Sequence, residues 1–276
     1  MARIVRHESE RDRWELVHGA PDPRLDGYVL NYCAYDERTG SFTRRRELPG
    51  DRVVIIVNLG APLRVLGAGE FATGFLAGMD DTYSVTETGG AQRGVQIDLS
   101  PVGAHLLLRL PMHEVFGRLV TLEELFGGRG LLLWEALACA AGWEERFAVL
   151  DEFLLGRLDD ALSPVPSVTR ALGRLRASGG TVRVDALAAE LGCSRRYLTA
   201  GFREQVGVPP KLFARILRFH RAVGLIGTGP GWAEIALACG YYDQAHLIRD
   251  FKQFAGSTPG EFAQRLLPDG GGVVAD

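Results

Sequence analysis

One pattern of apolar residues, glycines and prolines occurs twice in the last hundred residues, and it limits the possible folds more than any other feature. The first copy comprises Leu187-Ala188, Gly192, Ser194, Leu198, Phe202-Arg203, Gly207, Pro210 and Phe213. The second copy comprises Ile235-Ala236, Gly240, Asp243, Leu247, Phe251-Lys252, Gly256, Pro259 and Phe262. The offset is 48 residues before the turn glycine and 49 after it, so the second turn has one additional residue. Each copy predicts a short helix, a glycine turn and a second helix, the helix-turn-helix arrangement that enters the DNA major groove. A helical solenoid is the alternative, but solenoids need at least about three units to bury a core.

The first copy has the residues that a helix-turn-helix unit requires. We expect Asp185 to cap a helix that ends near Leu191, Gly192 to take the positive φ of the turn, and Ser194 to cap the second helix. Leu198 and Phe202 are four residues apart and should face the core. The outward positions offer guanidinium groups, a hydroxyl and a methyl for bases and phosphates: Arg195, Arg196, Thr199, Ala200 and Arg203. We expect Arg195, near the helix start, to contact phosphate. An ordinary exposed helix face is the alternative for a single helix of this kind.

The second copy repeats this arrangement. Asp243 is expected to cap the helix, and Leu247 and Phe251 to pack in the core. The outward positions are Gln244, Ala245, Ile248, Arg249 and Lys252. Glutamine suits adenine and arginine suits guanine, whereas Ile248 either touches thymine methyl groups or turns partly into the core. His246 is expected to pack or cap.

An apolar-rich segment from Lys211 to about Ile226 joins the two copies. Its apolar residues have helical spacing: Leu212, Ile216, Phe219, Val223 and Ile226. A rigid helix of this length is expected to hold the two recognition helices about 34 Å apart, which is one turn of DNA.

The charge distribution supports a polyanionic partner for the repeat. Residues 1–166 contain 17 arginines, no lysine and 25 acidic residues, whereas residues 167–267 contain 14 basic and 7 acidic residues. A basic segment attached to an acidic one favours DNA phosphate binding, because neutralised phosphates release counterions.

Bulk composition restricts the remaining classes. The chain has 276 residues, of which 46% are hydrophobic and 24% charged, as in an ordinary protein of two domains. No run has the length of a membrane span and the amino terminus has no signal-peptide core, so we expect a cytoplasmic protein. The four cysteines are scattered without metal-ligand spacing, which favours structural roles for Cys193 and Cys239.

Residues 26–100 have the composition of a β domain. Strands are expected at 27–32, 41–48, 52–57, 62–67, 70–77, 82–88 and 92–99, a spacing that is typical of a small barrel or sandwich. Helices are expected at 102–109, 112–118, 121–126, 130–140 and 143–160. The last of these carries Phe147, Leu150, Leu154 and Leu158 on one stripe beside Phe153, for which an intradomain core is favoured over a dimer seam.

The repeat resembles the carboxy-terminal domain of AraC/XylS-type bacterial transcription regulators. The matching segments are 186–194 (ALAAELGCS), 202–210 (FREQVGVPP), 233–236 (AEIA), 240–247 (GYYDQAHL) and 251–259 (FKQFAGSTP). The resemblance covers about residues 170–266 and implies a seven-helix domain with two helix-turn-helix units in adjacent major grooves. It implies DNA contacts at the outward positions named above. Trp232, Leu247 and Ala263 depart from the residues that are common in the family.

The amino-terminal part resembles sensory domains of such regulators in 48–51 (LPGD), 56–60 (IVNLG), 93–98 (RGVQID) and 120–127 (VTLEELFG). This resemblance implies a cupin-like β-barrel followed by helices that dimerise. The expected fold class is therefore α+β with two domains. The expected division is a regulatory or dimerisation domain at 1–162, a linker at 163–169, the DNA-binding domain at 170–267 and a disordered tail at 268–276.

The expected function is a sequence-specific DNA-binding transcription regulator without a cofactor. Its partners are double-stranded DNA and, as open alternatives, RNA polymerase, a small-molecule effector and a second copy of the chain. Whether it activates or represses stays open.

Enzyme classes find little support in the sequence. The β region has no paired histidines for a metal site, and the chain has no GxSxG nucleophile elbow and no phosphate-binding loop. We therefore expect neither a catalytic residue nor a metal. One alternative is a DNA-repair protein that takes alkyl groups onto a cysteine through the same kind of DNA-binding domain, although Cys33 and Cys139 have no basic neighbour that would activate them.

Overall fold

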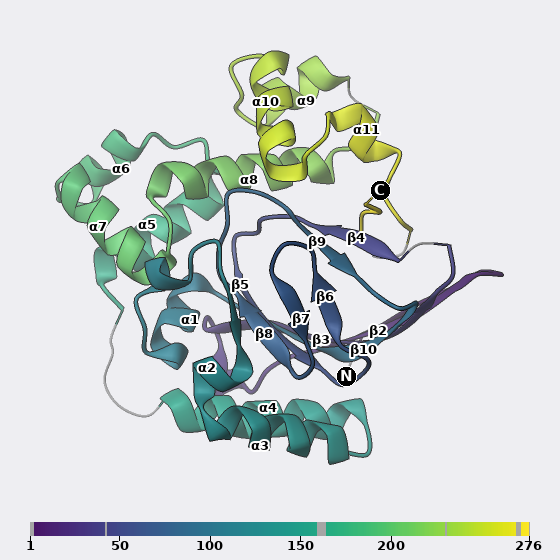
Figure 1. The fold of residues 1–276 in the computed structure, drawn as a ribbon. Helices are drawn as coiled ribbons and strands as arrows, with labels where there is room; N and C mark the ends of the chain where they lie inside the picture. Colours follow the sequence, from purple (N-terminus) through teal and green to yellow (C-terminus); the bar gives the residue numbers. More distant parts are fainter. Residues whose placement is uncertain (1–2, 42, 159–163, 230, 269–271, 276) are drawn as a thin grey trace.

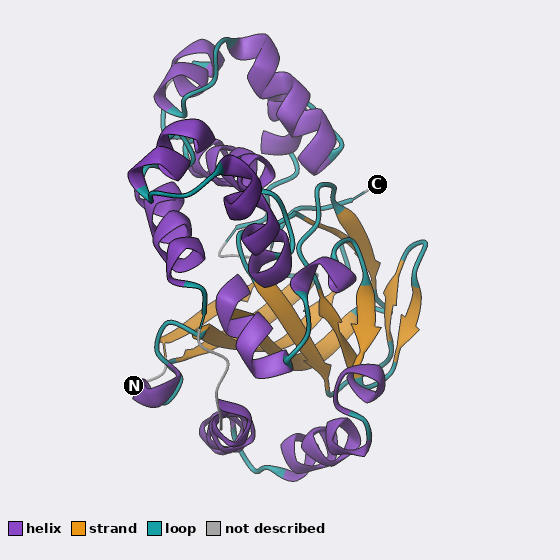
Figure 2. Cartoon of the chain, turned by 90° about the vertical axis from the view of Figure 1, so that its left-hand side faces the viewer, coloured by secondary structure: helices purple, strands orange, loops and turns teal. Residues whose placement is uncertain are grey.

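The computed structural model describes residues 3–41, 43–158, 164–229, 231–268 and 272–275. An amino-terminal part consists of two antiparallel sheets followed by helices, and a carboxy-terminal part is helical (Figure 1). Figure 2 shows the carboxy-terminal helices at one end of the sheets and further helices at the opposite end. This agrees with the expected α+β class of two parts.

The larger sheet has seven strands in the order β1-β2-β3-β10-β5-β8-β11. In that order the strands span Arg3–Glu8, Asp12–Gly19, Val29–Thr39, Ala91–Leu99, Val53–Asn58, Gly74–Ala77 and Leu119–Thr121. Strand β5 packs against different elements on its two faces. Its residues Ile55 and Val57 belong to the core that continues into the helices, whereas Ile56 faces the second sheet.

The smaller sheet has four strands in the order β4-β9-β6-β7. These span Arg44–Glu47, Ser84–Glu87, Leu63–Val65 and Gly69–Phe71. Five side chains bring the two sheets together in one apolar cluster: Ile56, Leu63, Val65, Phe71 and Phe75.

The structure confirms strands in every segment where the sequence predicts them. The expected strand at 70–77 is two strands, β7 and β8, because the chain turns before Gly74, where φ is 122°. Strands β1 and β2 lie outside the predicted β region. Neither has more than two consecutive apolar residues among its charged ones, so both lack the apolar runs on which the prediction depended.

Four α-helices follow β10 in the amino-terminal part. They are α1 (Pro101–Leu108), α2 (Leu122–Phe126), α3 (Gly128–Cys139) and α4 (Trp143–Leu158). The short 3-10 helix η2 (Met112–Val115) lies between α1 and α2, and a second one, η1 (Pro23–Leu25), precedes β3. Helix η2 replaces the longer helix that was expected at 112–118. In α4, Phe147, Leu150 and Leu154 are buried in the core, which confirms an intradomain role for this stripe. Residues 159 and 160 of the predicted helix lie outside the described residues.

Seven helices form the carboxy-terminal part of the described chain. They are α5 (Pro166–Ala177), α6 (Val184–Glu190), α7 (Arg195–Val206), α8 (Pro210–Gly224), α9 (Trp232–Ala238), α10 (Gln244–Ala255) and α11 (Pro259–Ala263). The last residues of the linker expected at 163–169 belong to α5, which begins at Pro166. Proline is suited to the first turn of a helix. The first residue of the expected linker, 163, lies outside the described residues.

The tail differs from the disorder that the sequence predicts. Residues 269–271 and 276 lie outside the described residues, but Val273 and Ala275 are buried. Val274 forms β-bridge pairing with Arg45, and Val273 with Leu266. The edge of β4 offers unpaired backbone groups, and the tail satisfies them, which a composition-based expectation of disorder does not consider.

Within the described residues, no helix combines the length and the apolar character needed to cross a bilayer.

Candidate DNA-binding surface

The first repeat copy folds as a helix-turn-helix unit formed by α6 and α7. Gly192 has φ of 65° in the turn, and the Ser194 side chain accepts a hydrogen bond from the Tyr197 amide at 3.1 Å, so both expectations are confirmed. The prediction that Asp185 caps α6 is wrong. The cap position belongs to Arg183, and Asp185 lies in the first helical turn, where its carboxylate is 3.3 Å from the Arg195 guanidinium.

The core side of α7 is fully buried. Leu198 and Phe202 have no exposed surface, and the Phe202 ring meets that of Phe213 edge-on with 6.3 Å between centroids. The opposite side presents the predicted contact residues. Arg195, Arg196, Ala200 and Arg203 are exposed, and Thr199 is half-buried. The Arg195–Asp185 pair is more than half exposed on both sides, so it leaves Arg195 available at little cost.

The second copy folds as the equivalent unit formed by α9 and α10. Gly240 has φ of 77°, and the Asp243 carboxylate accepts a hydrogen bond from the His246 amide at 2.7 Å, which confirms the predicted cap. Leu247 and Phe251 are fully buried. His246 packs edge-on against Tyr241, with 5.1 Å between ring centroids, as the predicted packing role requires.

The outward side of α10 matches that of α7. Gln244, Ala245, Arg249 and Lys252 are exposed. Ile248 is half-buried, which is intermediate between the exposed position that contact with thymine requires and burial in the core. The structure thus places all ten predicted contact residues on two helices, in the same relation to a capped helix start. Their contacts with bases and phosphates stay a prediction.

Helix α8 joins the two units, close to the expected range. Ile216 and Phe219 are fully buried, Leu212 and Val223 are half-buried, and Ile226 follows the end of the helix. Phe219 meets Phe251 of α10 at 4.9 Å between ring centroids, which packs the connecting helix directly on the second unit.

A buried ion pair between α8 and α10 was not foreseen from the sequence. Arg215 donates to the Asp250 carboxylate at 2.6 Å and to the Gln253 side chain at 2.7 Å. The Asp250 side chain is 3% exposed and that of Arg215 is 25% exposed. Asp250 adjoins the fully buried Phe251 and lies three residues after Leu247, and a charge in that position is the signal that predicts a buried partner.

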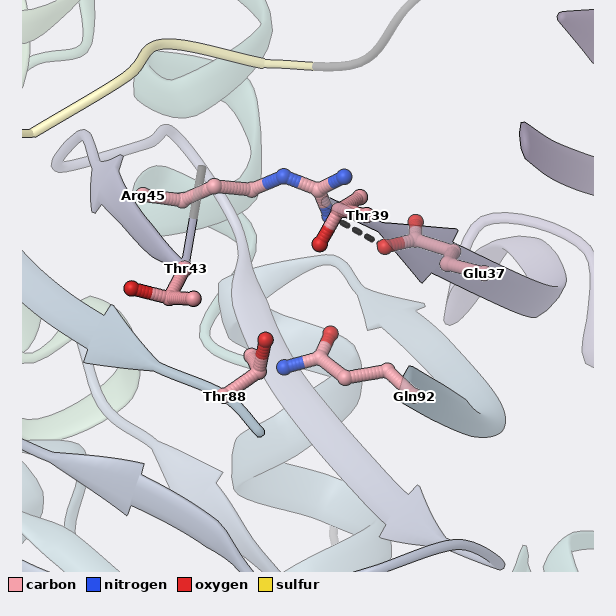
Figure 3. A pocket seen from close by; sticks show the side chains of 6 residues that line it. All are labelled: Glu37, Thr39, Thr43, Arg45, Thr88 and Gln92. Carbon is pink, nitrogen blue, oxygen red and sulfur yellow. Dashed lines mark hydrogen bonds and ion pairs between the residues drawn. The ribbon is translucent and has the colours of Figure 1, made fainter. Parts of the chain in front are cut away.

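The amino-terminal domain holds a small polar cavity at the rim of its sheets (Figure 3). Its volume is about 10 Å³, which is room for roughly one water molecule. Residues of four strands and their loops line it: Glu37, Thr39, Thr43, Arg45, Thr88 and Gln92. The Arg45 guanidinium and the Glu37 carboxylate are 2.5 Å apart, while burial of Glu37 raises the pKa of that carboxyl.

The Cys33 thiol does not have the character of an alkyl acceptor, whereas Cys139, the other candidate, is exposed. Burial raises the pKa of the Cys33 thiol to about 12, which is the reverse of what a reactive thiolate needs. Cys239 is buried in the carboxy-terminal core, and burial raises its pKa as well. Among the residues that the structure describes, no three histidine, cysteine or carboxylate side chains gather where a metal ion would bind.

Residues 187–265 match the family model of a helix-turn-helix domain. The chain is 35% identical over 88 residues to the F1 operon positive regulatory protein of Yersinia pestis, an alignment that covers 32% of this chain and 29% of that protein. The chain therefore spans less than a third of the length of this relative.

Two solved structures share parts of the architecture. A transcriptional regulator from Chromobacterium violaceum, of the kind with an AraC-type DNA-binding domain, is 31% identical, with a TM-score of 0.34 over 37% of this chain and 95% of that one. ToxT from Vibrio cholerae, solved with a bound unsaturated fatty acid, is 13% identical, with a TM-score of 0.48 over 94% of this chain and 100% of that one.

Proposed function

Because this chain belongs to the AraC/XylS family of transcription regulators through its carboxy-terminal domain, we propose that it binds DNA at two adjacent major-groove segments and regulates transcription from there. The observation that carries this proposal is the repetition of one exposed cationic helix face, on α7 and on α10, each behind a capped helix start. A recognition helix contacts bases with its first turns, and these are the turns that both helices expose.

Each contact residue has a proposed role. Arg196, Arg203 and Arg249 supply guanidinium groups that match the two acceptors of guanine, and Gln244 matches the donor and acceptor of adenine. Thr199 offers a hydroxyl group, and Ala200, Ala245 and Ile248 offer methyl groups for thymine. Arg195 and Lys252 bind phosphates, which fixes the position of the helices but carries no sequence information.

The amino-terminal domain is proposed to modulate this binding, through dimerisation, a ligand or both. We infer that its two sheets belong to a cupin-like barrel, which the apolar cluster between Ile56, Phe75 and the smaller sheet supports. On α3, Leu131 and Leu132 are 51% and 63% exposed. An apolar pair of this kind on an outer helix supports a second copy of the chain as the partner of α3.

Selection of bound duplexes from a random DNA pool with the full chain tests the proposal. Arg249→Ala is expected to cost about 1–3 kcal/mol of binding free energy and to relax the preference at one base pair. Arg195→Ala is the matched control, because loss of a phosphate contact weakens binding to all sequences alike and flattens the salt dependence by about one unit. The proposal fails if the full chain prefers no duplex over heparin at physiological salt.

A further inference from the structure

The amino-terminal domain contacts the same point of both recognition helices. Gly207 ends α7 and Gly256 ends α10, both with positive φ, and they occupy equivalent positions of the repeat, 49 residues apart. A Cβ atom on Gly207 would lie 3.0 Å from the Met112 carbonyl oxygen, and one on Gly256 would lie 2.3 Å from the Tyr83 ring. Two residues of one domain thus cover the carboxy-terminal ends of two separate recognition helices.

The contact with the first unit is mainly apolar. It is made by α1 and η2, which pack against α7, and Met112 and Val115 are both buried there. One polar contact lies at its edge, where the His113 ring is 3.9 Å from the Glu204 carboxylate and both side chains are half exposed.

The contact with the second unit is mainly polar. The Arg46 guanidinium of β4 donates to the Ala255 carbonyl and, at 3.2 Å, to the Ser257 hydroxyl, and it lies 4.8 Å from the centroid of the Tyr83 ring. The Thr82 hydroxyl donates to the Gln253 carbonyl at 3.3 Å. These hydrogen bonds occupy the last carbonyls of α10, which have no partner within the helix.

Two further contacts lie between these points. Arg176 of α5 donates to the Asp51 carboxylate at 3.1 Å and to its carbonyl at 2.9 Å. His220 of α8 is hydrogen-bonded through Nε2 to the Pro49 carbonyl at 2.7 Å. On the far side, the tail reinforces the second contact, since the Arg46 amide donates to the Val273 carbonyl at 2.8 Å.

The two units are therefore connected twice. Helix α8 joins them through the chain, and the amino-terminal domain joins them through space. The second connection contacts the carboxy-terminal ends of α7 and α10, whereas Arg196, Gln244 and Arg249 are exposed nearer the amino-terminal ends. Arg203 and Lys252, in the last turns of the two helices, are exposed as well, so the DNA-facing positions stay open. A closed ring of two rigid links resists changes in the separation and angle of the two helices more than α8 alone does.

We propose that the amino-terminal domain sets the separation at which the two recognition helices meet DNA, so that the chain discriminates between operators by the spacing of their two half-sites. This rests on the proposed function. One added base pair moves a half-site by about 3.4 Å and rotates it by roughly one-tenth of a turn. A rigid pair of helices then loses contacts at one half-site, whereas a loosened pair follows the displacement.

The test uses a duplex selected by the full chain from a random pool, and the same duplex with one base pair inserted between the half-sites that footprinting defines. For the unsubstituted chain we expect the insertion to weaken binding at least about tenfold, the equivalent of losing one or more base contacts. Arg46→Met keeps the volume of the buried side chain but removes its hydrogen bonds, and it is expected to reduce this discrimination several-fold. Arg64→Met is the matched control, because Arg64 pairs with Glu87 on the same sheet, away from α10, and should leave the ratio unchanged.

Thr82→Val keeps the test decisive if Arg46→Met does not fold. It removes only the hydrogen bond to the Gln253 carbonyl from an exposed position, and it should reduce the ratio in the same direction by a smaller factor. Equal spacing ratios for the unsubstituted chain and the folded variants would overturn the inference, and so would an insertion that leaves the binding of the unsubstituted chain unchanged. Failure to select any duplex would instead count against DNA binding itself.

Discussion

The two helix-turn-helix units share a pattern but are held in place by different forces. Gly201 of α7 and Asp250 of α10 occupy equivalent positions, 49 residues apart. A Cβ atom on Gly201 would lie 2.8 Å from a Val168 methyl group, so the missing side chain lets α5 approach α7 closely. In the second unit the same position carries a buried carboxylate, which Arg215 of α8 neutralises.

The difference follows from the neighbour of each recognition helix. The partner of α7 is the apolar side of α5, where the smallest residue gives the closest packing. The partner of α10 is α8, which brings a long cationic side chain that requires an acid. A repeat therefore fixes the fold of each unit, while the neighbouring helix decides which residue is suited to the position that faces it.

The largest expected effect comes from removing the buried ion pair between α8 and α10. Arg215→Ala leaves Asp250 buried without its partner and should lower the free energy of unfolding by about 3–5 kcal/mol, in the lower part of that range because Arg215 is partly exposed. Urea denaturation measures the loss. The control is Arg174→Ala on α5, whose pair with Glu190 of the first unit is about half exposed and should contribute little to stability. Equal losses for the two variants would mean that the units do not differ in this way.

Removal of the caps tests what the units have in common. Ser194→Ala and Asp243→Ala should each lower the free energy of unfolding by about 1 kcal/mol, because each leaves one amide at the start of a recognition helix without its acceptor. The loss should be somewhat larger for Asp243, whose charge also interacts with the helix dipole. The exchanges Ser194→Asp and Asp243→Ser are the controls and should keep most of the stability. A cap variant as stable as the unsubstituted chain would contradict the shared role.

The smallest expected effect concerns the contact between α8 and the amino-terminal domain. Burial holds the pKa of His220 below its ordinary value of 6.5, and the nearby charges are Asp51, which raises this pKa, and Arg52, which lowers it. The folded protein then binds fewer protons than the unfolded chain, so this stability is present above about pH 6.5 and is lost as the pH falls toward the folded pKa. Urea midpoints at pH 7.5 and 5.5 measure the loss.

The control for the pH effect is His220→Gln, which keeps a donor for the Pro49 carbonyl but does not titrate. The fall in midpoint between the two pH values should be smaller for this variant than for the unsubstituted chain. Identical pH dependence would mean that His220 does not contribute.

Local pattern predicts the repeat well and the contacts between distant segments poorly. Ser194, Gly192 and Asp243 act within a few residues of their own position, so the sequence identifies their roles directly. The prediction for Asp185 was wrong because α6 already begins at Val184, which places Asp185 within the first helical turn rather than before it. The Arg215–Asp250 pair and the contact between Arg46 and Ala255 join residues that no periodicity relates.

The same reasoning explains the amino-terminal part. Runs of β-branched residues such as those of β5 predict strands, whereas β1 becomes a strand through pairing with β2, and β2 through pairing with β1 and β3. The ten predicted contact residues could be assigned to equivalent positions because the repeat aligns two helices, and their contacts with DNA stay a prediction. The points that connect these helices to the sheets were not found, because Met112 and Tyr83 belong to segments with no repeated counterpart.

The pairing of Arg45 with Val274 has a consequence for the order of events during biosynthesis. Chains emerge from the ribosome at about 5–20 residues per second, and the domain synthesised first generally folds first. Strand β4 is therefore synthesised early, whereas Val274, which pairs with its edge, is synthesised after both recognition helices. A nascent molecule can therefore form its sheets and both helical units before Val274 pairs with β4, so this pairing joins parts that are already folded.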